Sequence, residues 1–175
     1  MNAARAGNLS CASRVFARGD TKREREMEMK GSTAGQDFEK LDKPHKAWRG
    51  EVPPESYHVL FEEGTERAGT SPLNQEKRAG TFVCAACNLP LFRSDTKYES
   101  GTGWPSFYDY IPGHLDTKRD FTLIWPRTEY HCARCGGHQG HVFGDGPAPT
   151  GKRYCNNGVA LHFVPDGEPL PPLKD

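Results

Sequence analysis

Two pairs of cysteines, each with two residues between its members, constrain this sequence more than any other feature. They are Cys84 with Cys87 and Cys132 with Cys135. Turn-forming or small residues follow each pair, and a tight turn of this kind presents two thiolates to one side of a metal ion. A Zn²⁺ ion takes four such thiolates in a tetrahedral shell. We therefore predict one structural zinc ion, held by these four cysteines, that ties together two hairpins distant in the sequence.

Other uses of these cysteines are compatible with their spacing. A redox-active pair needs a thioredoxin-like βαβ context, which a chain so often interrupted by Gly and Pro does not offer. A local shell of Cys132, Cys135, His138 and His141 would leave the first pair without a partner. A secreted disulfide scaffold is usually shorter and denser in cysteine. A filled four-cysteine shell has no open position for water, so it disfavours zinc hydrolase or deaminase chemistry and places catalysis elsewhere.

The charge balance narrows the range of partners. The chain of 175 residues has 23 Lys and Arg against 23 Asp and Glu, so its formal net charge is zero. This composition provides no electrostatic footprint for nucleic acid or for an anionic membrane. No apolar run approaches the roughly 18 residues that a membrane span requires. We expect one compact domain, no nucleic-acid or membrane partner, and a monomer.

The chain divides into three parts. The first is polar and highly charged, and we predict that it is mostly disordered. Its beginning, residues 1–19, contains Arg5, Arg14 and Arg18 and no acid before position 20, a pattern compatible with an organelle transit peptide. The paired cysteines favour a reducing compartment, and we expect a cytoplasmic protein. The three parts are a leader, 1–45, a folded domain, 46–166, and a Pro-rich tail, 167–175.

Gly and Pro divide the folded part into short segments. Segment 54–64 has Tyr57, Leu60 and Phe61 at helical spacing before a Gly, which predicts a short helix. Four later segments are short, rich in β-branched or aromatic residues and bounded by turn residues, as strands are. The predicted strands are 80–84, 121–126, 152–155 and 158–164. The predicted fold class is therefore mainly β.

Cys155 lies outside both pairs and has surroundings suited to a nucleophile. Arg153 precedes it by two residues, so on a strand the cation lies on the same face as the sulfur and favours the thiolate. Upstream lie His138, His141 and Asp145. An imidazole can donate a proton near pH 7, and a carboxylate can orient it. A lone cysteine is more often inert and buried, but this combination of residues indicates a catalytic thiol.

The segment GTGWPSF, residues 101–107, places Trp104 in a loop that contains two glycines. An aromatic ring on such a loop suits a pocket for a small apolar cation or a methyl group. A tryptophan in a β domain is more often part of the core. This segment therefore indicates a substrate pocket only in combination with the other motifs.

Four longer motifs follow one another along the chain. They are WRGEVPPESYHVLFEEGTER at 48–67, GTGWPSF at 101–107, HQGHVFGDGP at 138–147 and RYCNNGVALHF at 153–163. Together with both cysteine pairs they closely resemble the B-type peptide methionine sulfoxide reductases, and the resemblance spans about residues 46–166. It implies a catalytic domain of coiled antiparallel β-sheets in the β-tent arrangement, a structural zinc ion and reduction of methionine-R-sulfoxide in proteins.

The resemblance also implies a role for each site residue. Cys155 would attack the sulfoxide sulfur, release methionine and become a sulfenic acid, with Trp104 packed against the methyl group of the substrate. The other residues would surround the sulfoxide oxygen or support the histidines and the thiolate. The first group comprises His138, His141 and Asn157, and the second comprises Asp145 and Arg153.

Thr102 departs from one common pattern of this family, in which a resolving cysteine occupies its position. With four cysteines assigned to zinc, the one thiol besides Cys155 is Cys11, in the leader. We therefore predict that an external thiol reduces the sulfenic acid, either thioredoxin or glutathione with glutaredoxin. The alternative function is a non-catalytic, zinc-bound β module that binds a protein partner, and it predicts an unreactive Cys155.

Overall fold

The computed structural model describes residues 38–120 and 127–175, which belong to one compact unit. Its antiparallel sheets and single α-helix in the described residues confirm the mainly β class. Most of the leader, with Cys11, and the predicted strand 121–126 lie outside the described residues. In the described part, no helix has the length and apolar character to cross a membrane. The cytoplasmic location, the targeting role of residues 1–19 and the domain limits stay predictions.

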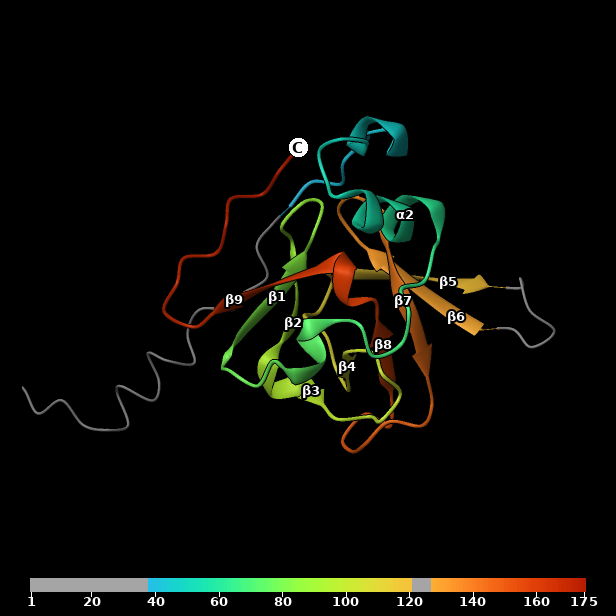
Figure 1. Cartoon of the computed structure of the whole chain (residues 1–175), viewed down its shortest axis with the longest axis vertical. Helices are drawn as coiled ribbons and strands as arrows, with labels where there is room; N and C mark the ends of the chain where they lie inside the picture. Colours follow the sequence, from blue (N-terminus) through green and yellow to red (C-terminus); the bar gives the residue numbers. More distant parts are fainter. Residues whose placement is uncertain (1–37, 121–126) are drawn as a thin grey trace, which may run out of the picture. The chain divides into compact units, whose positions relative to one another are not determined.

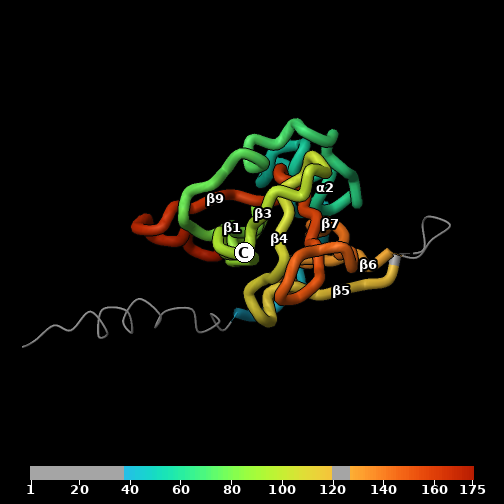
Figure 2. The backbone as a smooth tube through the Cα atoms, turned by 90° about the horizontal axis from the view of Figure 1, so that it is seen from below, coloured from blue at the N-terminus to red at the C-terminus, as the bar shows by residue number. Residues whose placement is uncertain are grey.

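Two antiparallel sheets make up the domain (Figure 1). The smaller sheet has the strand order β2 (Pro90–Arg93), β1 (Gly80–Cys84), β9 (Leu161–Pro165). The larger has the order β3 (Lys97–Tyr98), β4 (Ser106–Phe107), β8 (Arg153–Asn156), β7 (His138–Phe143), β6 (Arg127–Cys132), β5 (Leu115–Asp120). Figures 1 and 2 both show β1 and β9 on one side of this unit and β5 and β6 on the other.

The sequence pattern predicts two of the following three strands and misses the third. The predicted strand 80–84 coincides with β1, and 152–155 differs from β8 by one residue at each end. The pattern did not indicate β5, because its sequence LDTKRD is almost entirely polar. β5 lies at the edge of the larger sheet, where one side of a strand faces no partner and charged side chains are favoured.

The predicted strand 158–164 is wrong at its start. Gly158–Ala160 form a 3-10 turn, η4, and β9 begins only at Leu161. The backbone amides of Gly158 and Val159 donate to the carboxylate oxygens of Glu66 at 2.6 and 3.1 Å. These amides are therefore bound to a side chain and do not extend the sheet ladder.

The helix α2 (Pro54–Glu62) confirms the predicted helix, although it ends two residues early. Proline occupies its first turn, where a missing N–H costs nothing. Glu63 adopts the left-handed conformation with φ of 55° and ends the helix, and Gly64 follows it. Tyr57, Leu60 and Phe61 are buried as the helical spacing predicts. The helix packs against β7, which carries two of the candidate histidines.

The core lies between the two sheets and is rich in aromatic rings. Phe82 of β1 meets Phe107 of β4 edge-on, with ring centroids 5.0 Å apart, and Phe92 of β2 stacks on Phe107 at 4.1 Å. Tyr130 and Tyr154 continue this cluster through β6 and β8, with centroids 5.4 Å apart. These contacts hold β8, the strand of Cys155, against a rigid interior.

Short 3-10 helices and an extended tail complete the described chain. The other helices of this kind are η1 (His45–Trp48), η2 (Pro72–Gln75) and η3 (Ser94–Thr96). The Pro-rich tail forms no strand, since proline cannot donate to a sheet ladder, and it lies against the first cysteine turn. There the amide of Lys174 donates to the carbonyl of Cys87 at 3.1 Å, and Asn88 donates its side-chain amide to the carbonyl of Pro172 at 2.8 Å.

Candidate functional site

The four paired cysteines meet in one buried cluster at the ends of two strands. Cys84 ends β1 and Cys132 ends β6. The Cys84 sulfur lies 3.7 Å from that of Cys135, and the Cys87 sulfur lies 3.5 Å from that of Cys132. A tetrahedral zinc ion with bonds of about 2.3 Å separates its sulfurs by about 3.8 Å. The cluster therefore fits a four-thiolate metal site that joins the two sheets.

The local backbone explains why the sulfurs converge. The amide of Asn88 donates to the carbonyl of Cys84, and the amide of Gly136 donates to that of Cys132, each at 2.9 Å. Asn88 and Gly136 have φ of 63° and 72°, the left-handed conformation that such tight turns require. Both turns therefore have the same form, as paired metal-binding turns do.

The electrostatics of the cluster also suit a cation. Hydrogen bonds from the other three thiols, together with burial, raise the pKa of Cys84, whereas hydrogen bonds from the same set lower the pKa of Cys87. One thiolate is thus stabilised by its protonated neighbours, and each further ionisation is opposed. A bound divalent cation removes this opposition, since it favours thiolate at every ligand.

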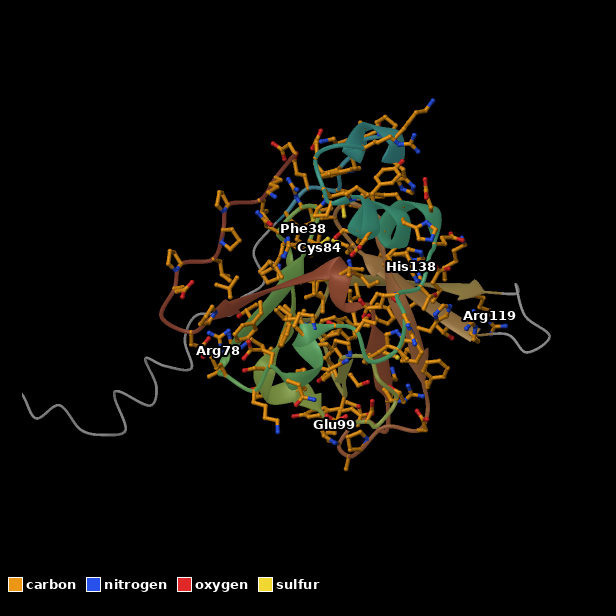
Figure 3. All side chains as sticks on the ribbon, in the orientation of Figure 1. Phe38, Arg78, Cys84, Glu99, Arg119 and His138 are labelled. Atoms are coloured by element: carbon orange, nitrogen blue, oxygen red, sulfur yellow. The ribbon has the colours of Figure 1, made fainter. Side chains whose placement is uncertain are left out.

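The local shell of two cysteines and two histidines is not what the structure shows. Cys132 and Cys135 face the other cysteine pair, while His138 lies against Glu129, with Nδ1 and Oε1 2.5 Å apart. Figure 3 labels Cys84 and His138 at separate places in the domain.

Cys155 is half-buried and lines a pocket of about 150 Å³. Its strand, β8, pairs Cys155 with Ser106 of β4 on one side and with His141 of β7 on the other. The pocket is lined by Thr65, Trp104, Arg127, Gly140, His141, Phe143, Cys155, Asn156 and Asn157. Three of the residues selected from the sequence, Trp104, His141 and Asn157, thus share one cavity with the thiol.

The Trp104 ring is held in place by Glu66, a residue that the sequence reasoning missed. The indole Nε1 donates to the Glu66 carbonyl at 3.1 Å, while the Glu66 carboxylate binds the backbone after Cys155. Glu66 therefore fixes one wall of the pocket relative to the strand of the thiol. Its only sequence signal was its place in the motif at 48–67, because an acid in a polar segment has no periodicity to mark it.

Arg153 and Asp145 form a two-point ion pair beside Cys155. The Arg153 Nε and Nη2 atoms each lie 2.9 Å from an Asp145 oxygen. Burial raises the pKa of Cys155, whereas Arg153, and a hydrogen bond from Thr102, lower it. The cation acts in the direction that the sequence indicated, but burial is the larger effect. The thiolate is therefore favoured less than the sequence suggested.

The opposing effects of burial and of the Arg153 charge on the pKa of Cys155 can be separated by substitution. Arg153→Met keeps the aliphatic stem but removes the charge, so we expect the pKa of Cys155 to rise further and the thiolate fraction at pH 7 to fall about tenfold per pKa unit. The rate of alkylation of Cys155 by iodoacetamide, followed against pH, measures this shift. Lys152→Met is the matched control, since Lys152 lies one residue away on an exposed position. Equal pH profiles for both variants would contradict the electrostatic role of Arg153.

A β-bulge explains how His138 and His141 reach one face of β7. Residues three apart on a regular strand point to opposite faces. Here the register with β6 shifts between Tyr130 and His131, so that Glu129 pairs with His141 and His131 with His138. The rings of His138 and His141 lie with centroids 5.4 Å apart. The pattern of histidines alone could not show this, because a bulge depends on the pairing with the neighbouring strand.

The two histidines nevertheless occupy different positions. His141 lines the Cys155 pocket, whereas His138 is buried and lines a second cavity with His131. Burial lowers the pKa of His138, although Glu129 opposes this effect. Glu129 was not among the residues selected from the sequence, because nothing in a strand of alternating polar residues marks one carboxylate as buried.

The side chain of Asn157 forms hydrogen bonds with backbone groups around the site. Its Nδ2 donates to the carbonyl of Gln139 at 3.1 Å, and its Oδ1 accepts from the amide of Glu66 at 3.0 Å. It thereby holds β7, the segment after α2 and the end of β8 together. A contact between Asn157 and the substrate oxygen stays a prediction.

Thr102 belongs to a chain of hydroxyl groups beside Cys155. The Ser100 oxygen lies 2.8 Å from the Thr102 and the Ser106 hydroxyl oxygens, and Ser106 lies opposite Cys155 in the sheet. The described residues contain no cysteine near Cys155 outside the metal cluster. The described part of the chain therefore offers no thiol to resolve an oxidised Cys155.

The domain has two β-sheets, a cluster of four cysteines suited to a metal ion, and a separate pocket around a fifth cysteine, which defines a β protein with a thiol site apart from its metal site. Comparison with known proteins makes the class specific: residues 52–165 match the family described as the SelR domain. A peptide methionine sulfoxide reductase MsrB of Methanosarcina barkeri is 51% identical over 129 residues, which cover 73% of this chain and 91% of that protein. An MsrB of Pseudomonas putida is 52% identical over 129 residues, covering 73% and 97%.

A plant relative extends the comparison. The peptide methionine sulfoxide reductase B1, chloroplastic, of Arabidopsis thaliana is 50% identical over 115 residues, covering 65% of this chain and 57% of that protein. The chain belongs to the MsrB family of peptide methionine sulfoxide reductases.

Proposed function

We propose that this chain reduces methionine-R-sulfoxide in proteins to methionine, with Cys155 as the nucleophile. The observation that carries the proposal is the pocket in which Cys155, Trp104 and His141 meet, in a chain that belongs to this reductase family. In this proposal the zinc ion stabilises the fold and takes no part in the reaction. Its four-cysteine shell would be filled by the protein, so the reaction takes place at the thiol.

The proposed reaction is a transfer of oxygen from one sulfur to another. The Cys155 thiolate attacks the sulfoxide sulfur, the sulfoxide oxygen takes up a proton, and the oxygen passes to the cysteine as the S–O bond to methionine breaks. The sulfoxide gains two electrons and leaves as the thioether, while Cys155 becomes a sulfenic acid. His141, which pairs with Cys155 across the sheet and lines the same pocket, is our candidate to supply the proton.

The pocket also offers a reason for selecting one epimer. The Trp104 ring provides an apolar surface for the methyl group, whereas His141 provides a polar surface for the oxygen. The two epimers of a sulfoxide exchange these positions, so a rigid pocket binds only one of them productively. Glu66 supplies the rigidity, since it fixes both the indole and the backbone after Cys155.

Regeneration requires two reducing equivalents from outside this pocket. Two thiols convert the sulfenic acid to the thiol and water and become a disulfide. We infer that thioredoxin, or glutathione with glutaredoxin, supplies them, because Thr102 stands at the position of a resolving cysteine. The proposed enzyme acts as a monomer on oxidised proteins and needs no nucleic acid or membrane.

The function is tested with the two epimers of dabsyl-methionine sulfoxide and dithiothreitol as reductant. We expect the full chain, loaded with zinc, to reduce the R epimer at least about a hundredfold faster than the S epimer, since misplacing the reacting atom by about 1 Å costs that much. Chromatographic separation of dabsyl-methionine measures the rate. Equal rates, or no product from the R epimer, would contradict the proposal.

A further inference from the structure

A second group of metal-ligand side chains is separate from the four cysteines, and its members do not line the Cys155 pocket. It consists of Glu129, His131 and His138, whose ligand atoms all lie within 4.8 Å of one another. Glu129 and His131 stand two apart on β6 and therefore share a face, and His138 faces them from β7. Two paired strands thus hold three donors toward a single point.

The distances suit a small ion after a minor adjustment. Glu129 Oε1 lies 2.9 Å from His131 Nε2 and 2.5 Å from His138 Nδ1. Ligands at right angles around an ion, with bonds of about 2.1 Å, lie about 3.0 Å apart. The first separation fits directly, and a small rotation of the His138 ring opens the second.

Two of these atoms have no other use in the described structure. The side chains of Glu129 and His138 are 5% and 3% exposed. Neither Glu129 Oε1 nor His138 Nδ1 has a partner of hydrogen-bond geometry among the described residues, although they lie close together. A carboxylate buried against two imidazoles is costly unless a positive charge lies close to it.

The group is open on one side. His131 and His138 line a cavity of about 290 Å³ together with His45, the last three residues of α2 and Glu63. The cavity leaves room for water or another ligand to complete the coordination. Figure 3 shows His138 beneath α2, and both contribute to the lining of this cavity.

We propose that Glu129, His131 and His138 form a second metal site, for a divalent first-row transition ion such as Zn²⁺, Co²⁺ or Fe²⁺. Two imidazoles and one carboxylate on one face, with open positions opposite, are a donor set that such ions favour. The site is distinct from the four-thiolate cluster in its donors and in having open positions.

The second site has a consequence that rests on the proposed function. His138 would carry the ion on Nδ1, while its ring lies beside that of His141 in the Cys155 pocket. The ion fixes the ring and places a positive charge near the imidazole that supplies the proton. Occupancy of the site therefore lowers the reductase rate.

The test uses the full chain with one equivalent of zinc in the cysteine cluster, titrated with Co²⁺. Cobalt bound to nitrogen and oxygen shows weak ligand-field bands in the visible range, without the strong thiolate charge-transfer band that cysteine ligands give. We expect one further cobalt ion to bind and to show only the weak ligand-field bands of nitrogen and oxygen ligands. Glu129→Gln and His131→Asn should each weaken its binding at least about tenfold.

His58→Asn is the matched control, because His58 is an exposed imidazole on α2 that pairs with Glu62 outside the group. It should bind the second cobalt ion as the parent does. Because His131 is only half-buried, we expect His131→Asn to fold even if Glu129→Gln does not. Zinc content and circular dichroism monitor the folding of both variants. No second cobalt ion in the parent, unchanged binding in a folded variant, or a thiolate band would each overturn the proposal.

The reductase rate separates this proposal from the function it rests on. With the second cobalt ion bound, the parent should reduce the R epimer at least about tenfold more slowly, whereas His131→Asn should keep its rate. A reductase that binds no second cobalt ion would overturn the metal site alone. A chain that binds this ion but reduces neither epimer would overturn the proposed function alone.

Discussion

Replacement of Cys155 with serine is expected to lower kcat/KM for the R epimer by at least about a thousandfold. A serine hydroxyl at neutral pH is not ionised, and it cannot accept the sulfoxide oxygen as a sulfenic acid. The dabsyl-methionine assay with dithiothreitol measures the loss. Because Cys155 is half-buried and lies outside the metal cluster, the variant should keep its zinc and its circular dichroism spectrum.

Cys11→Ser is the matched control for this variant. It makes the same atomic change at a cysteine that belongs to neither CxxC pair and lies outside the described residues, and we expect the parent rate. A Cys155→Ser variant that stays active would contradict the catalytic account. If the parent itself is inactive and Cys155 resists alkylation, the alternative of a non-catalytic zinc-bound β module is favoured.

Removal of one ligand from the cysteine cluster is expected to have the largest effect on stability. Cys135→Ser should release the metal and lower the free energy of unfolding by at least about 5 kcal/mol, since binding of structural zinc is itself folding free energy. The cluster joins the end of β1 to the end of β6, so its loss disconnects the two sheets. Zinc content by atomic emission and unfolding in urea measure both effects.

Cys155→Ser is also the control for this experiment, because it makes the same substitution away from the metal. It should retain one zinc ion and an unfolding midpoint close to that of the parent. A Cys135→Ser variant that retains the metal, or loses it without loss of stability, would contradict the structural role of the cluster.

The residues that the sequence revealed are those whose chemistry depends on residue type and local spacing. Two CxxC turns can present four thiolates whatever lies between them, and the structure brings all four together. The helix at α2 and the strand at β1 also follow from local patterns. Cys155, Trp104 and His141 could be selected because motifs place them, and they share one pocket.

The residues that the sequence did not reveal depend on contacts between distant segments. Glu66 is bound to the backbone 92 residues later, and Glu129 is buried only because β7 lies against β6. The bulge that turns His138 and His141 to one face is likewise a property of strand pairing. The start of β9 was misplaced for the same reason, since Glu66 binds the amides of Gly158 and Val159, which precede the strand.

The most direct test of the account is one turnover without reductant, analysed by mass spectrometry. The full, zinc-loaded chain is mixed with an excess of the R epimer and then treated with dimedone, which traps sulfenic acids. We predict one methionine released per chain and one dimedone adduct, located on Cys155, with none after the S epimer. A Cys11–Cys155 disulfide would contradict the external reductant, and methionine formed without oxidation of Cys155 would contradict the mechanism itself.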